Sequence, residues 1–404
     1  MRLIRNIGYL AVMLVGAMMC GCDDTLDRAS DTLTVSVAVE MPADVNAADV
    51  TDAVTTFRNL STGTLTKFTA TTGIQVPLGL YDIQYEAAYH TAAGVETRLR
   101  ASRQSVQITS NNQLIELKAF NNIMADDFII SEIFFTGTLQ TSGNSYVGDN
   151  YVKICNNTDH VLYADGLALI ESKFLTTENH GYTPDIISTD LTVDAVYVIP
   201  GSGMDHPVEP GGTILLADNA IDHRVINPNS MDLSHADWEW YDVSTKPSVQ
   251  DIDNPMVPNL ERWYCYTQSI FTLHSRGFKA YGLARIPVDR DTYVSDYRYD
   301  YDYELVVAAG TFPMSASAYR IPNEWIVDVV NLSVQAKYQW NVTAPQLDCG
   351  WTYCGTVDND KTRFGKSVKR RVLYTTTDGR TVLKDTNNSS VDFEPECVPT
   401  ETAD

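Results

Sequence analysis

The sequence predicts an all-β fold of two β-sandwich domains, the second carrying a long, loop-rich insertion. Three observations predict it. The 404 residues include 22 tyrosines, and Val and Thr, which also favour strands, are frequent. Apolar and polar residues alternate in short runs, as along Leu33–Glu40. Helical periodicity is hard to find, and Gly, Pro and Asn separate the runs as turn formers do.

The composition excludes some classes of function. A hydrophobic fraction of 44% is ordinary for folded protein, and the formal net charge is −23. A chain this acidic repels nucleic acid and anionic lipid surfaces. We therefore expect no nucleic-acid partner.

Residues 1–21 have the layout of a secretory signal peptide. Two arginines precede the apolar stretch Ile7–Met19, which is too short to cross a bilayer as a stable helix. Gly21 supplies the small residue that signal peptidases need before the cut. The sequence "MCGC" resembles a bacterial lipobox, which implies that Cys22 is lipidated and anchors the protein to the outer membrane. Ordinary secretion, with Cys22 left as a thiol, is the alternative.

An acidic tether follows in residues 22–32. It holds four aspartates without periodicity, so it should repel itself and stay extended. Acids directly behind the lipid cysteine also resemble the signal by which Bacteroides-type bacteria send lipoproteins to the cell surface. The resemblance implies a lipid-anchored, surface-exposed location. A solvated spacer facing the periplasm is the alternative.

Residues 33–120 are predicted to form a small β-sandwich. The stretch "VPLGLYDIQYEA" places Tyr81, Ile83 and Tyr85 on one face after a turn at Gly79. Its P-x-G-x-Y pattern is similar to carboxypeptidase-regulatory-like and transthyretin-like domains. That resemblance implies a module that presents the next domain and carries no active site.

Residues 121–396 are predicted to form the second sandwich, with 397–404 as a tail. The phrases "DDFIISEIFF", "DNYVKICNNTDHVLYADGLALIES" and "VEPGGTILLADNA" describe strands separated by turns. Their order resembles the lamin-tail sandwich, which implies an Ig-like domain; Lys153 stands where that family has an acid. The resemblance is interrupted by an insertion at about 218–320. Within it, "DYRYDYDYEL" predicts a strand with packed tyrosines on one face and wet acids on the other.

Taken whole, the chain resembles an uncharacterised family of Bacteroides-type surface lipoproteins with a domain of unknown function. The phrases that carry this resemblance are "IPGSGMDHPVEPGG", "NPNSMDLSHADWEWYD", "DIDNPMVPN" and "KDTNNSSVDFE". It implies a cell-surface location and no established activity.

Large aromatic residues in the insertion are the candidate ligand-binding residues. Aromatic faces beside carboxylates and amides are what sugars and flat ligands stack on. The candidates are Trp238, Trp240, Tyr241, Trp263 and Tyr264. The alternative is that these rings form a satellite core beneath the loops.

Clustered oxygen ligands suggest two calcium sites. The first is Asp251, Asp253 and Asn254, and the second is the run Asp358 to Asp360. Neither continues as an EF-hand loop, so we expect no cofactor, with calcium as the alternative.

Five cysteines follow Cys22. The stretch "CGWTYC" predicts a disulfide between Cys349 and Cys354, because the envelope is oxidising and Gly350 eases the turn. Cys155, Cys265 and Cys397 remain, and since five is odd, at least one thiol stays free or pairs with another molecule.

No catalytic motif supports an enzyme. The chain contains no G-x-S-x-G, P-loop, H-E-x-x-H or G-x-G-x-x-G pattern. We expect a non-enzymatic surface protein that captures a nutrient or glycan, as an accessory to an outer-membrane transporter. Adhesion or structural assembly without a pocket is the alternative, and an envelope hydrolase is third. Capture predicts a concave aromatic pocket around Trp238–Tyr266.

Overall fold

The computed structural model is built almost entirely of strands, so the all-β, multi-sheet prediction is confirmed. It describes residues 32–42, 45–90, 96–122, 127–377 and 379–402. The predicted signal peptide, Cys22 and the tether before Thr32 lie outside the described residues. The α-helices of the described part are the short α1 (Arg290–Asp296) and α2 (Ser389–Asp392). One-turn 3₁₀ helices lie at Ala47–Asp49, His223–Val225, Asn323–Trp325 and Lys361–Arg363.

The N-terminal domain is a sandwich of two sheets with strand orders β4-β1-β7 and β3-β2-β5-β6-β8. Its strands are β1 (Thr32–Glu40), β2 (Val50–Asn59), β3 (Leu65–Phe68), β4 (Ile74–Pro77), β5 (Gly79–His90), β6 (Glu96–Ile108), β7 (Gln113–Lys118) and β8 (Phe120–Asn122). Alternation decides which side chains are buried, because successive residues of a strand face opposite sides of the sheet. Tyr81, Ile83 and Tyr85 point into the core, as predicted.

The second domain packs two larger sheets face to face. One has the order β18-β17-β12-β9-β25-β28, and the other has the order β21-β22-β15-β14-β20-β23-β24, with β19 paired to β15. Their strands are β9 (Phe128–Phe134), β12 (Tyr151–Asn156), β14 (Leu167–Ser172), β15 (Asp190–Val198), β17 (Thr213–Ala217), β18 (Trp238–Glu239), β19 (Glu261–Cys265), β20 (Ala280–Arg285), β21 (Arg298–Val307), β22 (Gly310–Pro322), β23 (Ile326–Ser333), β24 (Thr352–Tyr353), β25 (Ser367–Arg370) and β28 (Phe393–Cys397). Small two-stranded sheets pair β10 (Thr138–Leu139) with β11 (Ser145–Tyr146), β13 (Leu162–Tyr163) with β16 (Pro207–Val208), and β26 (Val372–Thr375) with β27 (Thr381–Leu383).

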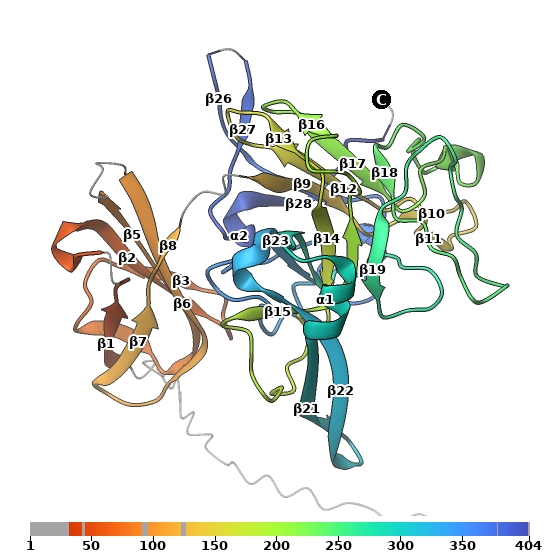
Figure 1. The fold of residues 1–404 in the computed structure, drawn as a ribbon. Coiled ribbons are helices and arrows are strands. Elements are labelled where there is room, and N and C mark those ends of the chain that lie inside the picture. Colours follow the sequence, from red (N-terminus) through yellow and green to blue (C-terminus); the bar gives the residue numbers. More distant parts are fainter. Residues whose placement is uncertain (1–31, 43–44, 91–95, 123–126, 378, 403–404) are drawn as a thin grey trace, which may run out of the picture.

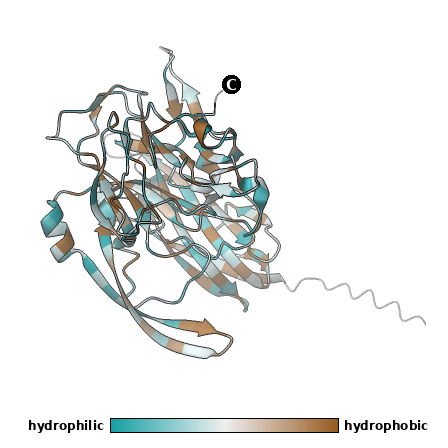
Figure 2. Ribbon diagram, turned by 90° about the vertical axis from the view of Figure 1, so that its right-hand side faces the viewer, coloured by the Kyte–Doolittle hydropathy of each residue, from teal (hydrophilic) through white to brown (hydrophobic). Residues whose placement is uncertain are grey.

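The main core lies between the two large sheets. Ile130, Ile154 and Leu216 reach it from the first sheet, and Leu169 and Leu283 reach it from the second. Figure 2 shows hydrophobic and hydrophilic bands alternating along the strands, as expected when one face is buried and the other is not.

The stretch 218–320 is rich in loops, but it also contributes strands to both large sheets. β18 extends the edge of the first sheet, and β20 lies between β14 and β23 in the second. The hairpin of β21 and β22 projects from the second domain (Figure 1). Along β21, Tyr299 and Tyr301 are buried and Asp300 and Asp302 are exposed, which confirms the predicted two-faced strand.

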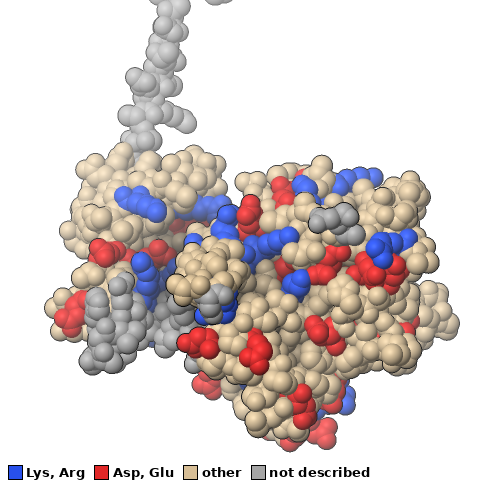
Figure 3. Space-filling model, turned by 90° about the horizontal axis from the view of Figure 1, so that it is seen from above, with Lys and Arg blue, Asp and Glu red and all other residues tan. Residues whose placement is uncertain are grey.

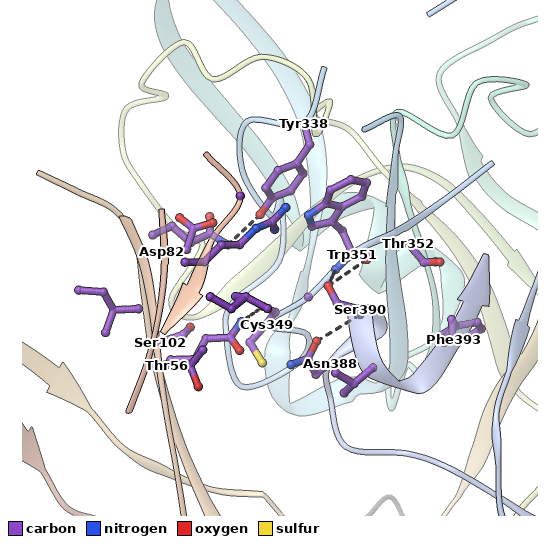
Figure 4. A pocket seen from close by; sticks show the side chains of 18 of the residues that line it. Thr56, Asp82, Ser102, Tyr338, Cys349, Trp351, Thr352, Asn388, Ser390 and Phe393 are labelled. Carbon is purple, nitrogen blue, oxygen red and sulfur yellow. Dashed lines mark hydrogen bonds between the residues drawn. The ribbon is translucent and has the colours of Figure 1, made fainter. Parts of the chain in front are cut away.

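The N-terminal domain lies beside the second domain, with β2, β5 and β6 between its own core and that neighbour (Figures 1 and 4). Side chains of these three strands that face away from the N-terminal core lie along the junction between the domains. Within the described ranges, no helix has the length and apolarity needed to cross a membrane.

Candidate functional site

A pocket of about 440 Å³ lies where the two domains meet. Figure 4 shows Thr56, Asp82 and Ser102 of the N-terminal domain on one side, and Tyr338 and Trp351 of the second domain on the other. Pockets between domains are common binding sites because neither domain alone has to fold around a cavity.

The N-terminal wall consists of the polar face of the five-stranded sheet. Along β5, buried Tyr81, Ile83 and Tyr85 alternate with Asp82 and Gln84, which face the pocket. The period of two that buries one face therefore exposes a polar face. The same alternation presents residues of β2 and β6, namely Thr56, Arg58, Ser102, Arg103 and Gln104.

The opposite wall consists of the segment 349–353 held against α2. A Cβ atom on Gly350 would lie 2.6 Å from the Ser390 main-chain nitrogen, so only glycine allows this close approach. The Trp351 main-chain N–H donates to Ser390 Oγ at 3.0 Å, and Ser390 Oγ in turn donates to the Trp351 carbonyl at 3.0 Å. The Trp351 ring stacks on Tyr338, with centroids 4.6 Å apart.

Two glutamines of the sheet join the domains across the pocket. Gln84 Nε2 donates to the Cys349 carbonyl at 2.9 Å. Gln104 Nε2 donates to the Tyr338 hydroxyl at 3.3 Å, and Gln104 Oε1 accepts from the Asn341 main-chain N–H at 3.2 Å. These bonds link the two walls of the pocket.

The lining contains charges of both signs and an unused hydrogen-bonding group. Arg58, Lys67 and Arg103 face Asp82 and Glu86 around the cavity. Burial raises the pKa of Asp82, while the Ser105 main-chain N–H and the Arg58 charge lower it, for a net increase. The Ser102 hydroxyl is buried and has no protein hydrogen-bonding partner. A ligand rich in hydroxyl or carboxylate oxygens fits such a lining.

The pocket's cysteine is not an activated nucleophile. Burial raises the pKa of the Cys349 thiol to about 12, although the Arg100 guanidinium opposes the shift. A nucleophilic cysteine needs the opposite shift, because the thiolate is the reactive form.

The predicted aromatic pocket around Trp238–Tyr266 is wrong. Trp238 and Trp240 are buried in the main core between the large sheets, because β18 joins the edge of the first sheet. Trp263 and Tyr264 lie on β19, where they pack on Tyr293 and Tyr319, and Tyr241 is half-buried. The alternative, that these rings pack beneath the loops, describes them.

The predicted disulfide between Cys349 and Cys354 is also wrong, because both thiols are free. The extended strand β24 separates them, so that Cys349 faces the domain junction and Cys354 lies in the main core. Cys155, Cys265 and Cys397 are free as well.

The loop acids predicted to bind calcium are engaged in local hydrogen bonds. Asp251 Oδ2 accepts from the Asp242 main-chain N–H at 2.9 Å, Asp253 Oδ1 accepts from Asn259 Nδ2, and Asn254 Nδ2 donates to the Ala220 carbonyl. In the second run, Asp358 pairs with Arg276 and Asp360 caps a 3₁₀ turn. Across the residues that the structure describes, no group of three or more His, Cys, Asp or Glu is placed to hold a metal ion. Calcium binding by these two runs stays a prediction.

Few features of the sequence indicate the junction pocket. Its N-terminal wall consists of polar residues in an alternating pattern, which indicates a solvent-facing surface to any reader of the sequence. The one feature that points to the pocket is the aromatic pair in "CGWTYC", although this stretch is more readily interpreted as a pair of cysteines.

Comparison with known proteins adds a family and a fold. Residues 209–400 match the family described as "Protein of unknown function (DUF4876)". This part of the chain is similar to a DUF4876 domain. It contains Cys349, Gly350 and Trp351 of the pocket, while the N-terminal wall lies outside the match.

The fold has a solved counterpart. The crystal structure of a DUF4876 family protein from Bacteroides thetaiotaomicron VPI-5482 is similar, with a TM-score of 0.56 and 18% sequence identity. The match covers 91% of this chain and 96% of that chain, so it spans both domains. No curated protein sequence matches. The resemblances of the separate domains to lamin-tail and carboxypeptidase-regulatory-like families stay predictions.

Proposed function

We propose that this protein is a lipid-anchored, cell-surface binding protein that captures a saccharide or a similar oxygen-rich nutrient in the junction pocket. The observation that carries the proposal is the pocket of about 440 Å³ between the domains. It combines basic side chains, an unpartnered Ser102 hydroxyl and the aromatic residue Trp351. Protein donors that lack partners are what the acceptor oxygens of a sugar would satisfy.

The surface location rests on the sequence. The "MCGC" stretch and the aspartates behind it support lipidation at Cys22 and export to the outer surface. On the face shown in Figure 3, basic and acidic side chains are interspersed, an arrangement that favours a protein standing free in solvent on its tether. An outer-membrane transporter is the partner to which captured ligand would pass.

Calorimetric titration of the purified protein with a panel of neutral and acidic oligosaccharides tests capture. Arg103→Ala removes an exposed basic group from the pocket rim and should weaken binding roughly tenfold. Lys118→Ala is the matched control, because Lys118 is an exposed basic residue of β7, in the other sheet of the same domain. Equal affinities for the two variants, or no binding by the wild type, would contradict capture at this pocket.

Location is tested separately. Cys22→Ser should release the protein from the membrane fraction, and protease added to intact cells should remove the wild-type domain. Protection of that domain on intact cells would place it in the periplasm and rule out a surface role.

The projecting hairpin favours protein contact, as in adhesion, as a second candidate. Val306 is 69% exposed and Phe312 is 46% exposed near its tip. Apolar side chains gathered on a projection are typical of binding surfaces. Replacing both with serine should abolish adherence of cells without changing saccharide binding, whereas unchanged adherence would dismiss this candidate.

A further inference from the structure

Unsatisfied polar atoms gather at one end of the main core. Both carboxylate oxygens of Asp218, both amide atoms of Asn150, one oxygen of Asp149 and the indole nitrogen of Trp240 lack hydrogen-bonding partners. Asp218 is 1% exposed, and the other three are fully buried. More than nine in ten buried polar groups in proteins have a partner, and each orphan costs about 1–3 kcal/mol. A ligand that pairs with these atoms would remove that cost.

The strand register brings Asn150 and Asp218 together. β12 and β17 are antiparallel, with Tyr151 opposite Ala217, and the Asp218 main-chain N–H donates to the Asn150 carbonyl at 2.9 Å. Opposed residues of an antiparallel pair project to the same face of the sheet. Tyr151 and Ala217 pack on the outer face. Asn150 and Asp218, one position further along, therefore face the interior side, where Trp240 lies.

The environment of Asp218 is negative. Burial raises the pKa of Asp218 well above its usual range, and the charges of Asp251, Asp149 and Asp242 raise it further. The Trp240 indole N–H lies near enough to oppose this shift, but its geometry falls outside a hydrogen bond. Asp242 already has its own cation, because Arg262 Nη1 lies 3.0 Å from it.

We propose that Asp218, Asn150 and Asp149 form a calcium-binding site. The group offers both Asp218 oxygens, the free oxygen of Asp149 and the amide oxygen of Asn150. Calcium takes about six to eight oxygen ligands from carboxylates, amides, main-chain carbonyls and water. The donors are two carboxylates and one amide, so this site holds fewer than three His, Cys, Asp or Glu side chains.

Two hydroxyl groups hold the second carboxylate oxygen of Asp149 in place. It accepts from Thr138 Oγ1 and from Ser230 Oγ, each at 2.5 Å. Such supporting bonds orient metal ligands and are typical of metal sites. Zinc and other soft ions are disfavoured, because the donor set contains only oxygen, and Mg²⁺ gives up its water shell reluctantly in a closed site.

The site would fasten the long loops of the second domain to its core. Asp218 begins the loop that leads to β18, and the charge of half-buried Asp251, from the loop before β19, is close enough to raise the pKa of Asp218. A bound ion would neutralise this group and stabilise the folded state in proportion to its occupancy. This role is independent of ligand capture at the junction pocket.

Calcium titration of chelator-treated protein tests the site. We expect a single calorimetric site for CaCl₂, a rise of the melting temperature with calcium concentration, and Tb³⁺ luminescence sensitised through the Trp240 indole. Asp218→Asn should weaken calcium binding roughly tenfold or more. Asp159→Asn is the matched control, because that side chain is 88% exposed in a turn far from the site, and it should bind like the wild type.

The proposal is overturned if the chelator-treated wild type shows neither calcium heat nor a melting shift, or if Asp218→Asn binds as tightly as the wild type. An equal melting shift with MgCl₂ or NaCl at the same ionic strength would overturn calcium as the ion. Should Asp218→Asn fail to fold, the wild-type melting and Tb³⁺ measurements decide alone.

Discussion

The second domain buries two groups of aspartates, and the fold balances their charge in different ways. In the Arg370 cluster, made of Arg370, Asp328, Asp385 and Asp392, the guanidinium lies 2.5 Å from Asp328 and 3.1 Å from Asp385. In the Asp218 cluster, made of Asp218, Asp149, Asn150 and Trp240, the Asp218 carboxylate has no hydrogen-bonding partner among the described residues.

The two clusters differ in the source of the positive charge that compensates the carboxylates. Arg370 reaches the interior from β25 and also donates Nε to the Ile130 carbonyl at 2.7 Å, so three strands are joined by one side chain. A fixed internal cation makes that cluster complete in the folded chain. The Asp218 cluster has the negative half of such an arrangement, and we attribute its missing half to calcium.

Of the substitutions that test this comparison, removal of Arg370 should change the free energy of unfolding most. Arg370→Met leaves buried carboxylates without their cation and should lower the free energy of unfolding by about 3–5 kcal/mol. Urea denaturation measures the loss. Arg371→Met is the control, because its pairing with Glu394 is exposed to solvent and should be worth less than about 1 kcal/mol. Similar losses for the two variants would mean that the buried cluster contributes no more than a surface pair.

His274, which belongs to neither cluster, should also make the free energy of unfolding depend on pH. Burial and the nearby Arg276 and Lys279 lower the pKa of His274 from 6.5 to about 4. Between these values the unfolded chain binds a proton that the folded chain does not, so stability is lost as the pH falls from 7 toward 4. The loss should reach about 3 kcal/mol. His274→Asn, which keeps an acceptor for the Phe278 N–H, should flatten the profile in denaturant melts at each pH. An unchanged slope would mean that folding does not lower the pKa of His274.

Neutralising Asp218 should change the free energy of unfolding least, and the change should have the opposite sign. In chelator, Asp218→Asn removes a buried unpaired carboxylate and should leave stability unchanged or raise it by about 1–2 kcal/mol. Asp328→Asn, the matched substitution in the Arg370 cluster, should be destabilising, because it removes a negative charge that pairs with Arg370. Thermal melts of both variants without calcium compare them directly. Equal destabilisation would show that the two clusters do not differ.

The sequence predicts correctly which side chains are buried where a single strand decides it. Tyr299 and Tyr301 are buried because residues two apart share a face, and that period is visible in the letters. It failed where two distant segments meet. Trp238 and Trp240 looked like loop aromatics, yet β18 pairs with β17 and carries both into the core. Cys349 and Cys354 looked like a pair, yet β24 keeps them apart.

The all-β class and the two-faced strands can be predicted from the residues of single strands, because alternation is a local property. The junction pocket and the contact of Asn150 with Asp218 arise only when distant segments pack together. The pocket needs polar faces from two domains, and the Asp218 cluster needs the register of β12 on β17. Such contacts depend on which surfaces exclude water together, and no stretch of a single strand contains that information.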